Sequence, residues 1–83
     1  MIPNKQNHVR IAANFDGEVE LLVSVGDVVF AGQGLVEVES DDAIERLCSK
    51  QRARVVELLV DQDAEVAKYD GLVVIELLPD EDD

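Results

Sequence analysis

Five consecutive residues hold most of the chemical potential of this sequence. They lie between two segments in which polar and apolar residues alternate, and they are Glu39, Ser40, Asp41, Asp42 and Ala43. Asp41, Asp42 and Glu45 could gather around a cation, but a strong divalent site needs several oxygens in fixed geometry. Ser40 has no neighbouring base that the sequence identifies, so no serine nucleophile is predicted. The spacing therefore favours an exposed acidic turn.

A second acidic segment has the alternating carboxylates of a calcium loop, at Asp61, Asp63 and Glu65. Such a loop also needs glycine at its sixth position and glutamate at its twelfth. Those two positions hold Val66 and Leu72. A solvated turn is the better interpretation, and we predict no metal site here.

Histidine and cysteine each occur once, at His8 and Cys48. One of each makes neither a structural zinc site nor a catalytic dyad that the sequence supports. The glycine-containing stretch 26–34 has the wrong spacing for a phosphate loop and leads into a strand rather than a helix. We therefore predict no catalytic residues, no metal and no enzymatic activity.

The charge balance is strongly acidic. Nineteen Asp and Glu face seven Lys and Arg, for a formal net charge of -12 at pH 7. Nucleic acids and anionic membranes repel a polyanion, so neither is an expected partner. The charge favours a protein partner with a basic surface, and the alternative is a solvated acidic surface with no specific partner.

Length and cysteine content bound the architecture and the compartment. The 83 residues predict one small domain, with a core over about 8–79 and loose ends at 1–7 and 80–83. Cys48 alone cannot form an internal disulfide, which favours a reducing compartment, the cytoplasm. We find no signal-peptide pattern and no apolar run of the roughly 18 residues that span a bilayer.

Short alternating segments at near-regular spacing predict an all-β sandwich or barrel. The expected strands cover residues 8–12, 18–23, 35–39, 43–49, 55–60 and 72–78. Pro79 ends the last strand because it has no N–H to donate to a ladder. A helix over 41–50 would suit its alanine, glutamate and leucine, but the segment is short and lies between β-like segments.

An internal repeat organises the chain. A shift of 37 places Leu21-Leu22-Val23 on Leu58-Leu59-Val60, and it places residues 34–39 on residues 71–76. Gly26 falls on Asp63 in the same register. Two copies of one supersecondary unit predict an internal pseudo-twofold axis.

Two motifs within this repeat identify a family. Residues 26–35 fit G-D-x-V-x-x-G-Q-x-L, and after an alternating strand residues 39–43 read Glu-Ser-Asp-Asp-Ala. This string resembles the biotinyl/lipoyl carrier domain family, in which the second motif is E-S-D-K-A, and the similarity covers about residues 15–78. The resemblance implies a flattened barrel of two four-stranded antiparallel sheets related by a pseudo-twofold, called a barrel-sandwich hybrid. It also implies a hairpin whose lysine is acylated by lipoic acid or biotin and swings between active sites.

In this sequence the position of that lysine is Asp42. Amide formation needs a primary amine as nucleophile, and a carboxylate has none, so we expect neither lipoate nor biotin as a cofactor. The other lysines do not occupy the hairpin position; they are Lys5, Lys50 and Lys68. The motif favours lipoyl over biotinyl ancestry, because biotinyl domains place methionines around their lysine and this hairpin has none.

The second repeat departs from the family pattern at two places. Ala53 stands where the family has glycine, and Asp63-Ala64 stands where it has Gly-Asp. Alanine in a left-handed conformation costs about 1 kcal/mol or more. Aspartate tolerates that conformation better than most residues, so we expect the fold to survive.

Three hypotheses for the function remain. The first is a non-catalytic binding or scaffold module of a multienzyme system, with residues 39–43 as the contact surface for a basic partner. The second is a lipoyl, or less favourably a biotinyl, acyl-carrier domain of a 2-oxo acid dehydrogenase-type complex in which Asp42 is an altered attachment site. The third is a structural module that packs against another chain, which an exposed apolar patch would favour.

Overall fold

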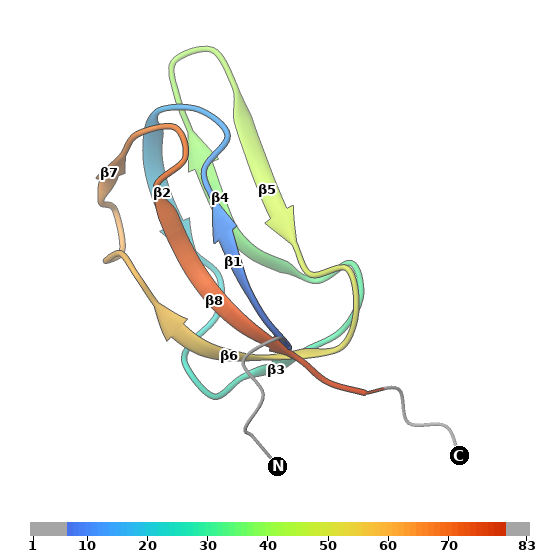
Figure 1. Cartoon of the computed structure of the whole chain (residues 1–83). Helices are drawn as coiled ribbons and strands as arrows, with labels where there is room; N and C mark the ends of the chain where they lie inside the picture. The colour runs from blue at the N-terminus through green and yellow to red at the C-terminus, as the bar shows by residue number, and fades with distance from the viewer. Residues whose placement is uncertain (1–6, 80–83) are drawn as a thin grey trace.

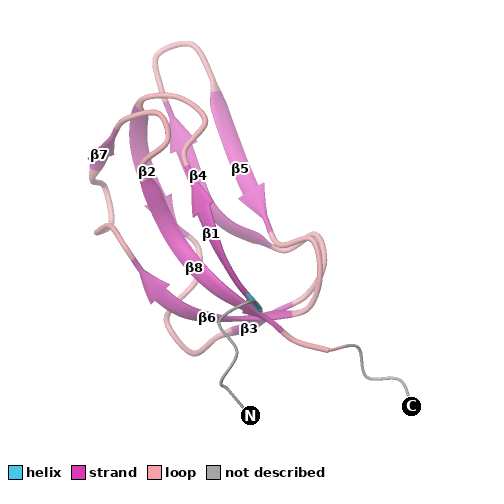
Figure 2. Cartoon of the chain, in the orientation of Figure 1, coloured by secondary structure: helices cyan, strands magenta, loops and turns pink. Residues whose placement is uncertain are grey.

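Strands and the loops between them make up nearly all of the described chain (Figure 2). The structure, a computed structural model, describes residues 7–79, so the loose ends predicted at 1–7 and 80–83 lie outside it except for Asn7. No helix in this range is long and apolar enough to cross a membrane. The strands are β1 (His8–Ala12), β2 (Gly17–Leu21), β3 (Val28–Val29), β4 (Gly34–Glu39), β5 (Ile44–Cys48), β6 (Ala53–Leu58), β7 (Glu65–Val66) and β8 (Gly71–Leu77).

These strands form two four-stranded sheets with the orders β1-β8-β6-β3 and β5-β4-β2-β7. Every pairing is antiparallel, and the two sheets share no strand, so they face each other without closing into one hydrogen-bonded barrel. The predicted all-β fold of two four-stranded antiparallel sheets is confirmed. Aliphatic side chains from the inner faces form the core, and those with the least exposure are Val19, Val29, Leu35, Val36, Val38, Ala53, Val55, Leu72 and Val73.

The predicted pseudo-twofold is present in the strand order and in the hydrogen bonds. Replacing β1, β8, β6 and β3 by β5, β4, β2 and β7 converts the order of one sheet into that of the other. Leu22 N–H donates to the Leu35 carbonyl at 3.0 Å, and Leu59 N–H donates to the Leu72 carbonyl at 2.8 Å. These two bonds are related by the shift of 37 that the sequence predicts.

The same symmetry relates the left-handed turn positions. Gly26 has φ 96° and its counterpart Asp63 has φ 69°, which confirms that aspartate adopts the conformation expected of it. Gly32 has φ 88° and its counterpart Tyr69 has φ 79°. A bulky residue is rare in this region of conformational space. Tyr69 is thus a strained position that the sequence prediction missed, although the shift of 37 aligns it with glycine.

The prediction of backbone strain at Ala53 is wrong. Ala53 belongs to β6, where it pairs with Val29 on one side and Leu77 on the other, and it has no positive φ. Its small side chain is fully buried instead. Space in the core, rather than backbone conformation, is therefore the constraint at this position.

Most predicted strand limits are within two residues of those observed. β1 agrees at both ends, and β6 runs over 53–58 instead of 55–60. Two strands, β3 and β7, were not predicted because each has only two residues, which is too short for alternation to be recognised. The helix considered over 41–50 is absent, since β5 occupies that segment.

The arrangement gives the molecule two distinct ends. The β4–β5 hairpin lies at one end beside the β1–β2 and β7–β8 loops, whereas β1 begins and β8 ends at the other (Figure 1). The hairpin is thereby presented to solvent at the end of the molecule opposite to the start of β1 and the end of β8.

Candidate functional site

The acidic segment singled out in the sequence forms the turn of the β4–β5 hairpin. Glu39 and Ile44 are the last paired residues, so the turn consists of residues 40–43. Ser40 N–H donates to the Ala43 carbonyl at 2.8 Å, which closes the turn. Ser40 Oγ accepts from the backbone N–H groups of Asp42 at 3.2 Å and Ala43 at 3.1 Å. Ser40 therefore sets the turn geometry through its own side chain and backbone.

Asp41 and Asp42 occupy the two central positions of this turn, and both are exposed. The Asp42 carboxylate makes no hydrogen bond or ion pair to another residue within 7–79. Its side chain is thus free to meet a partner, and the turn does not depend on what that side chain is. Chemically, the turn offers carboxylates that accept hydrogen bonds and attract cations, but no nucleophile with an adjacent base.

The base of the hairpin is held by a close approach of β2. A Cβ built on Gly17 would lie 2.6 Å from the Glu39 carbonyl oxygen and 2.9 Å from Val38 Cγ1. Only glycine allows two backbones to come this close. The position of the turn therefore depends on Gly17, a residue that is remote from it in the sequence.

Two loops at the same end are tied to the sheets. In the β1–β2 loop, Asn14 Nδ2 donates to Glu45 Oε1 on β5 at 2.9 Å. In the same loop, Asp16 Oδ1 accepts from the Lys68 backbone N–H in the β7–β8 turn at 2.8 Å. These bonds connect all three segments that meet at the hairpin end.

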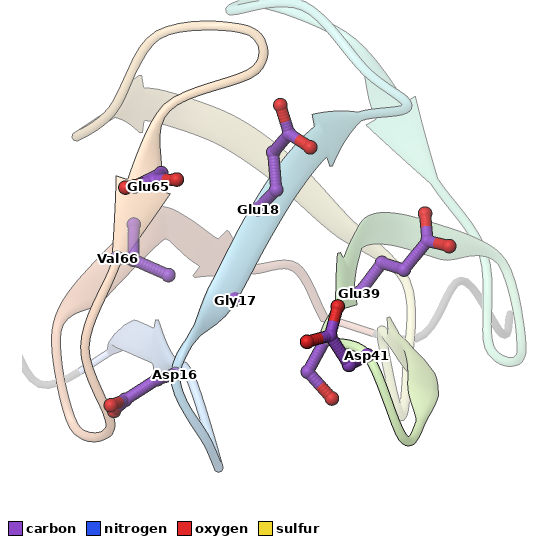
Figure 3. Close-up of a pocket in the computed structure, with 8 residues that line it drawn as sticks. Asp16, Gly17, Glu18, Glu39, Asp41, Glu65 and Val66 are labelled. Carbon is purple, nitrogen blue, oxygen red and sulfur yellow. The ribbon is translucent and has the colours of Figure 1, made fainter.

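A shallow depression of about 580 Å³ lies between these segments. Its lining includes Gly17, Ser40, Val66 and five acidic residues, which are Asp16, Glu18, Glu39, Asp41 and Glu65. Figure 3 shows the acidic side chains distributed around it from β2, β4, β7 and the adjoining loops. Of the predicted contact residues, three line the depression, while Asp42 and Ala43 lie beyond it. The five carboxylates attract cationic groups, yet no three His, Cys, Asp or Glu side chains within residues 7–79 are arranged to hold a metal ion.

The described lysines are not part of the turn. Lys50 is exposed in the β5–β6 loop. Lys68 lies in the β7–β8 turn, where its Nζ is 5.1 Å from the centroid of the Tyr69 ring. Lys5 falls outside the described residues. His8 is exposed at the start of β1, and Cys48 is half-buried at the end of β5, so they lie on different sheets.

Sequence reasoning identified the turn but missed residues that surround it. Alternation could have placed Glu18 and Glu39 on outward faces, because Val19 and Val38 between such positions are apolar. The contribution of Asp16 and the close approach of Gly17 depend on how the β1–β2 loop crosses from one sheet to the other. No local pattern records that crossing.

Comparison with known proteins gives one assignment at the level of families. Residues 9–75 match the family model for biotin/lipoyl domains, described as "Biotin-requiring enzyme". A search of curated proteins gives no significant match.

Several solved structures share the fold. A single-chain, multi-domain long-chain acyl-CoA carboxylase matches 94% of this chain with 8% of its own, at 23% identity and a TM-score of 0.80. The urea carboxylase of Kluyveromyces lactis matches 90% of this chain with 6% of its own, at 21% identity and a TM-score of 0.74. A protein described as a succinylglutamate desuccinylase/aspartoacylase, from Shewanella frigidimarina NCIMB 400, matches 88% with 21% of its own, at 19% identity and a TM-score of 0.74. The chain thus spans a small part of each of these proteins.

Proposed function

The chain belongs to the biotin/lipoyl domain family, and from this premise we propose that it is a non-catalytic binding module of a multienzyme system whose hairpin no longer carries a cofactor. Domains of this kind are carriers and do no chemistry of their own. The observation that supports the proposal is a hairpin with an ordered turn and an exposed aspartate, Asp42, at the position where the family motif has lysine. The partner that we propose is a protein with a basic surface.

The loss of cofactor follows from the chemistry of attachment. A ligase transfers the activated acyl group of lipoate or biotin to a primary amine, with formation of an amide bond. Asp42 offers a carboxylate, which cannot accept the acyl group as a stable amide. Lys50 and Lys68 lie in other loops, so neither presents its amine from the tip of the hairpin.

Intact mass after co-expression with a lipoate ligase and a biotin ligase, with both cofactors supplied, tests the attachment position. We expect the wild-type protein to stay unmodified and Asp42→Lys to gain one lipoyl or biotinyl group. Asp41→Lys is the matched control, because it places the same amine one turn position earlier. We expect it to stay unmodified.

Other outcomes would overturn parts of the proposal. Modification of the wild-type protein would mean that another lysine is presented, and the swinging-arm hypothesis would return. If Asp42→Lys remained unmodified with both ligases, residue 42 would not be a former attachment site.

The binding role is tested by competition for the ligase that modifies Asp42→Lys. Excess unmodified wild-type domain should slow this modification, because it presents the same turn without a reactive amine. Asp41→Ala/Asp42→Ala should compete less well, since it lacks both turn carboxylates. Equal competition by the two proteins would remove the turn carboxylates from the contact surface.

One observation favours a second candidate, a module that packs against another chain. Val25, Val28 and Phe30 around β3 are 59%, 40% and 58% exposed. Clustered apolar exposure of this kind is typical of interaction surfaces. Analytical ultracentrifugation should then show self-association, or a larger complex in the presence of a partner protein. Val25→Ser/Phe30→Ser should abolish that association.

A further inference from the structure

The outer face of the sheet β5-β4-β2-β7 is dominated by glutamate. Val19 and Val38 point into the core, so strand alternation directs their neighbours to the opposite face. On β2, β4 and β7 these outward residues are Glu18, Glu20, Glu37, Glu39 and Glu65. We call these five residues the glutamate face. Glu18, Glu39 and Glu65 are seen on their three strands in Figure 3.

The strand register sets these glutamates against one another. Glu18 lies directly opposite Glu39 on β4 and opposite Glu65 on β7. Glu20 lies opposite Glu37. Like charges directly opposite each other on neighbouring antiparallel strands are destabilising. The sheet therefore carries repulsion in three cross-strand pairs, all on the face that lies away from the core.

The other sheet shows that the fold does not require this arrangement. The shift of 37 places Glu39 on Glu76, and a β-bulge in β6 between Val55 and Glu57 brings Arg54, rather than the counterpart of Glu18, opposite Glu76. Arg54 Nη1 and Glu76 Oε1 are 3.1 Å apart and form an ion pair. The position facing the equivalent glutamate thus holds a cation in one sheet and a second glutamate in the other.

Only one cation offsets the charge of the face within residues 7–79. Arg46 on β5 binds Glu37, with Nη2 and Oε2 at 2.8 Å. Beside it, Ile44 is 61% exposed and lies opposite Glu39. Ile44 lines a second shallow depression together with four members of the glutamate face, which are Glu18, Glu20, Glu37 and Glu39. An exposed apolar side chain amid carboxylates of which only Glu37 is ion-paired suits a ligand that is itself both basic and apolar.

We propose that the glutamate face docks an extended basic segment of a partner protein, with lysine or arginine at alternate positions and an apolar side chain over Ile44. Alternate residues of an extended segment are about 6.8 Å apart, which equals the separation of Glu18 and Glu20 along β2. A cation bound between the two glutamates of each repulsive pair would attract both carboxylates. Binding would therefore relieve the cross-strand repulsion that destabilises the unbound sheet. This surface adjoins the turn, since Asp41 lines the same depression as Glu18 and Glu39, but it does not depend on the proposed loss of attachment.

The probe is a synthetic peptide of about nine residues in which lysine alternates with threonine around a central leucine. Its affinity is measured by calorimetric titration at low salt, against four proteins. These are the wild type, Glu18→Gln/Glu20→Gln on the face, Asp41→Asn/Asp42→Asn on the turn, and Glu57→Gln/Asp61→Asn as a control on the rest of the molecule. Each variant removes two exposed carboxylates, so all three have the same net charge.

We expect the face variant to lose about tenfold in affinity, and the other two to lose less than about twofold. Equal losses in all three variants would indicate general attraction to a polyanion and would overturn the proposal, as would failure of the wild type to bind. A loss confined to the turn variant would overturn it in favour of docking at the hairpin, as proposed for the module. Thermal unfolding gives a second readout: the face variant should be at least as stable as wild type, because repulsion is removed, so weaker binding cannot come from misfolding.

Discussion

Replacing Gly17 by alanine should destabilise the hairpin end, although Gly17 is remote from the hairpin in the sequence. The added Cβ would lie 2.6 Å from the Glu39 carbonyl oxygen and 3.0 Å from the Glu39 carbonyl carbon. Both atoms are backbone, so neither can rotate away as the end of a flexible side chain would. β2 and the end of β4 must move apart by several tenths of an ångström, at the point where the turn begins.

The size of the effect is a balance of two terms. Overpacking of this kind costs about 1–3 kcal/mol. Against it, Gly17 has no positive φ, so alanine restricts the unfolded chain and returns about 0.4–1 kcal/mol. We expect a net loss of about 1–2 kcal/mol in the free energy of unfolding, which lowers the melting temperature of a domain this size by roughly 4–16 °C.

Gly34→Ala is the matched control, because it makes the same substitution at the start of β4. Its Cβ would meet Arg46 Cδ at 2.7 Å and Leu22 Cδ1 at 3.0 Å, and both atoms belong to side chains that can rotate away, unlike backbone. Thermal unfolding followed by circular dichroism should show this variant near wild type while Gly17→Ala melts lower. If the two variants melted at the same temperature, the close approach at Gly17 would not be what holds the hairpin base.

Two further predictions follow from the pseudo-twofold. Tyr69→Gly should raise the free energy of unfolding by about 1 kcal/mol, because glycine adopts the φ of 79° without strain, whereas Gly32→Ala should lower it by about as much. Urea unfolding measures both changes. A destabilised Tyr69→Gly would show that the contacts of the tyrosine ring outweigh the backbone strain. Leu35→Ala and Leu72→Ala should each cost about 3 kcal/mol, since both side chains are fully buried at equivalent positions of β4 and β8; a large difference between them in the same assay would mean that the two halves of the core pack differently.

The sequence predicted the fold well because the fold is written in local patterns. Alternation identifies β1 and β4, where inward and outward residues are of opposite polarity. The shift of 37 identifies the symmetry, because turns and strands that occupy equivalent places need the same residue types. β3 and β7 escaped prediction because two residues carry no period. Their existence depends on pairing with β6 and β2 after the sheets have formed.

The candidate site could be predicted only where it is local. Ser40 and the two aspartates form their own turn, and the motif 39–43 marks them. Gly17 and Asp16 reach the same end through the β1–β2 loop, and Glu65 through β7. Pairing of β2 with both β4 and β7 decides which glutamates face one another. That choice is made by tertiary structure, so a sequence pattern cannot contain it.

Different residues of the hairpin form the turn and present the side chain at position 42, so that side chain could change without loss of the fold. The turn is closed by Ser40, whose backbone and hydroxyl oxygen make its hydrogen bonds, and its base is placed by Gly17. Asp42 contributes only its backbone N–H, which any residue except proline would supply. The turn therefore does not require a particular side chain at this position, and the choice of residue depends only on what binds there. Under the proposed loss of attachment, aspartate in place of lysine would remove the chemistry and reverse the charge, while the turn that presents the side chain stays intact.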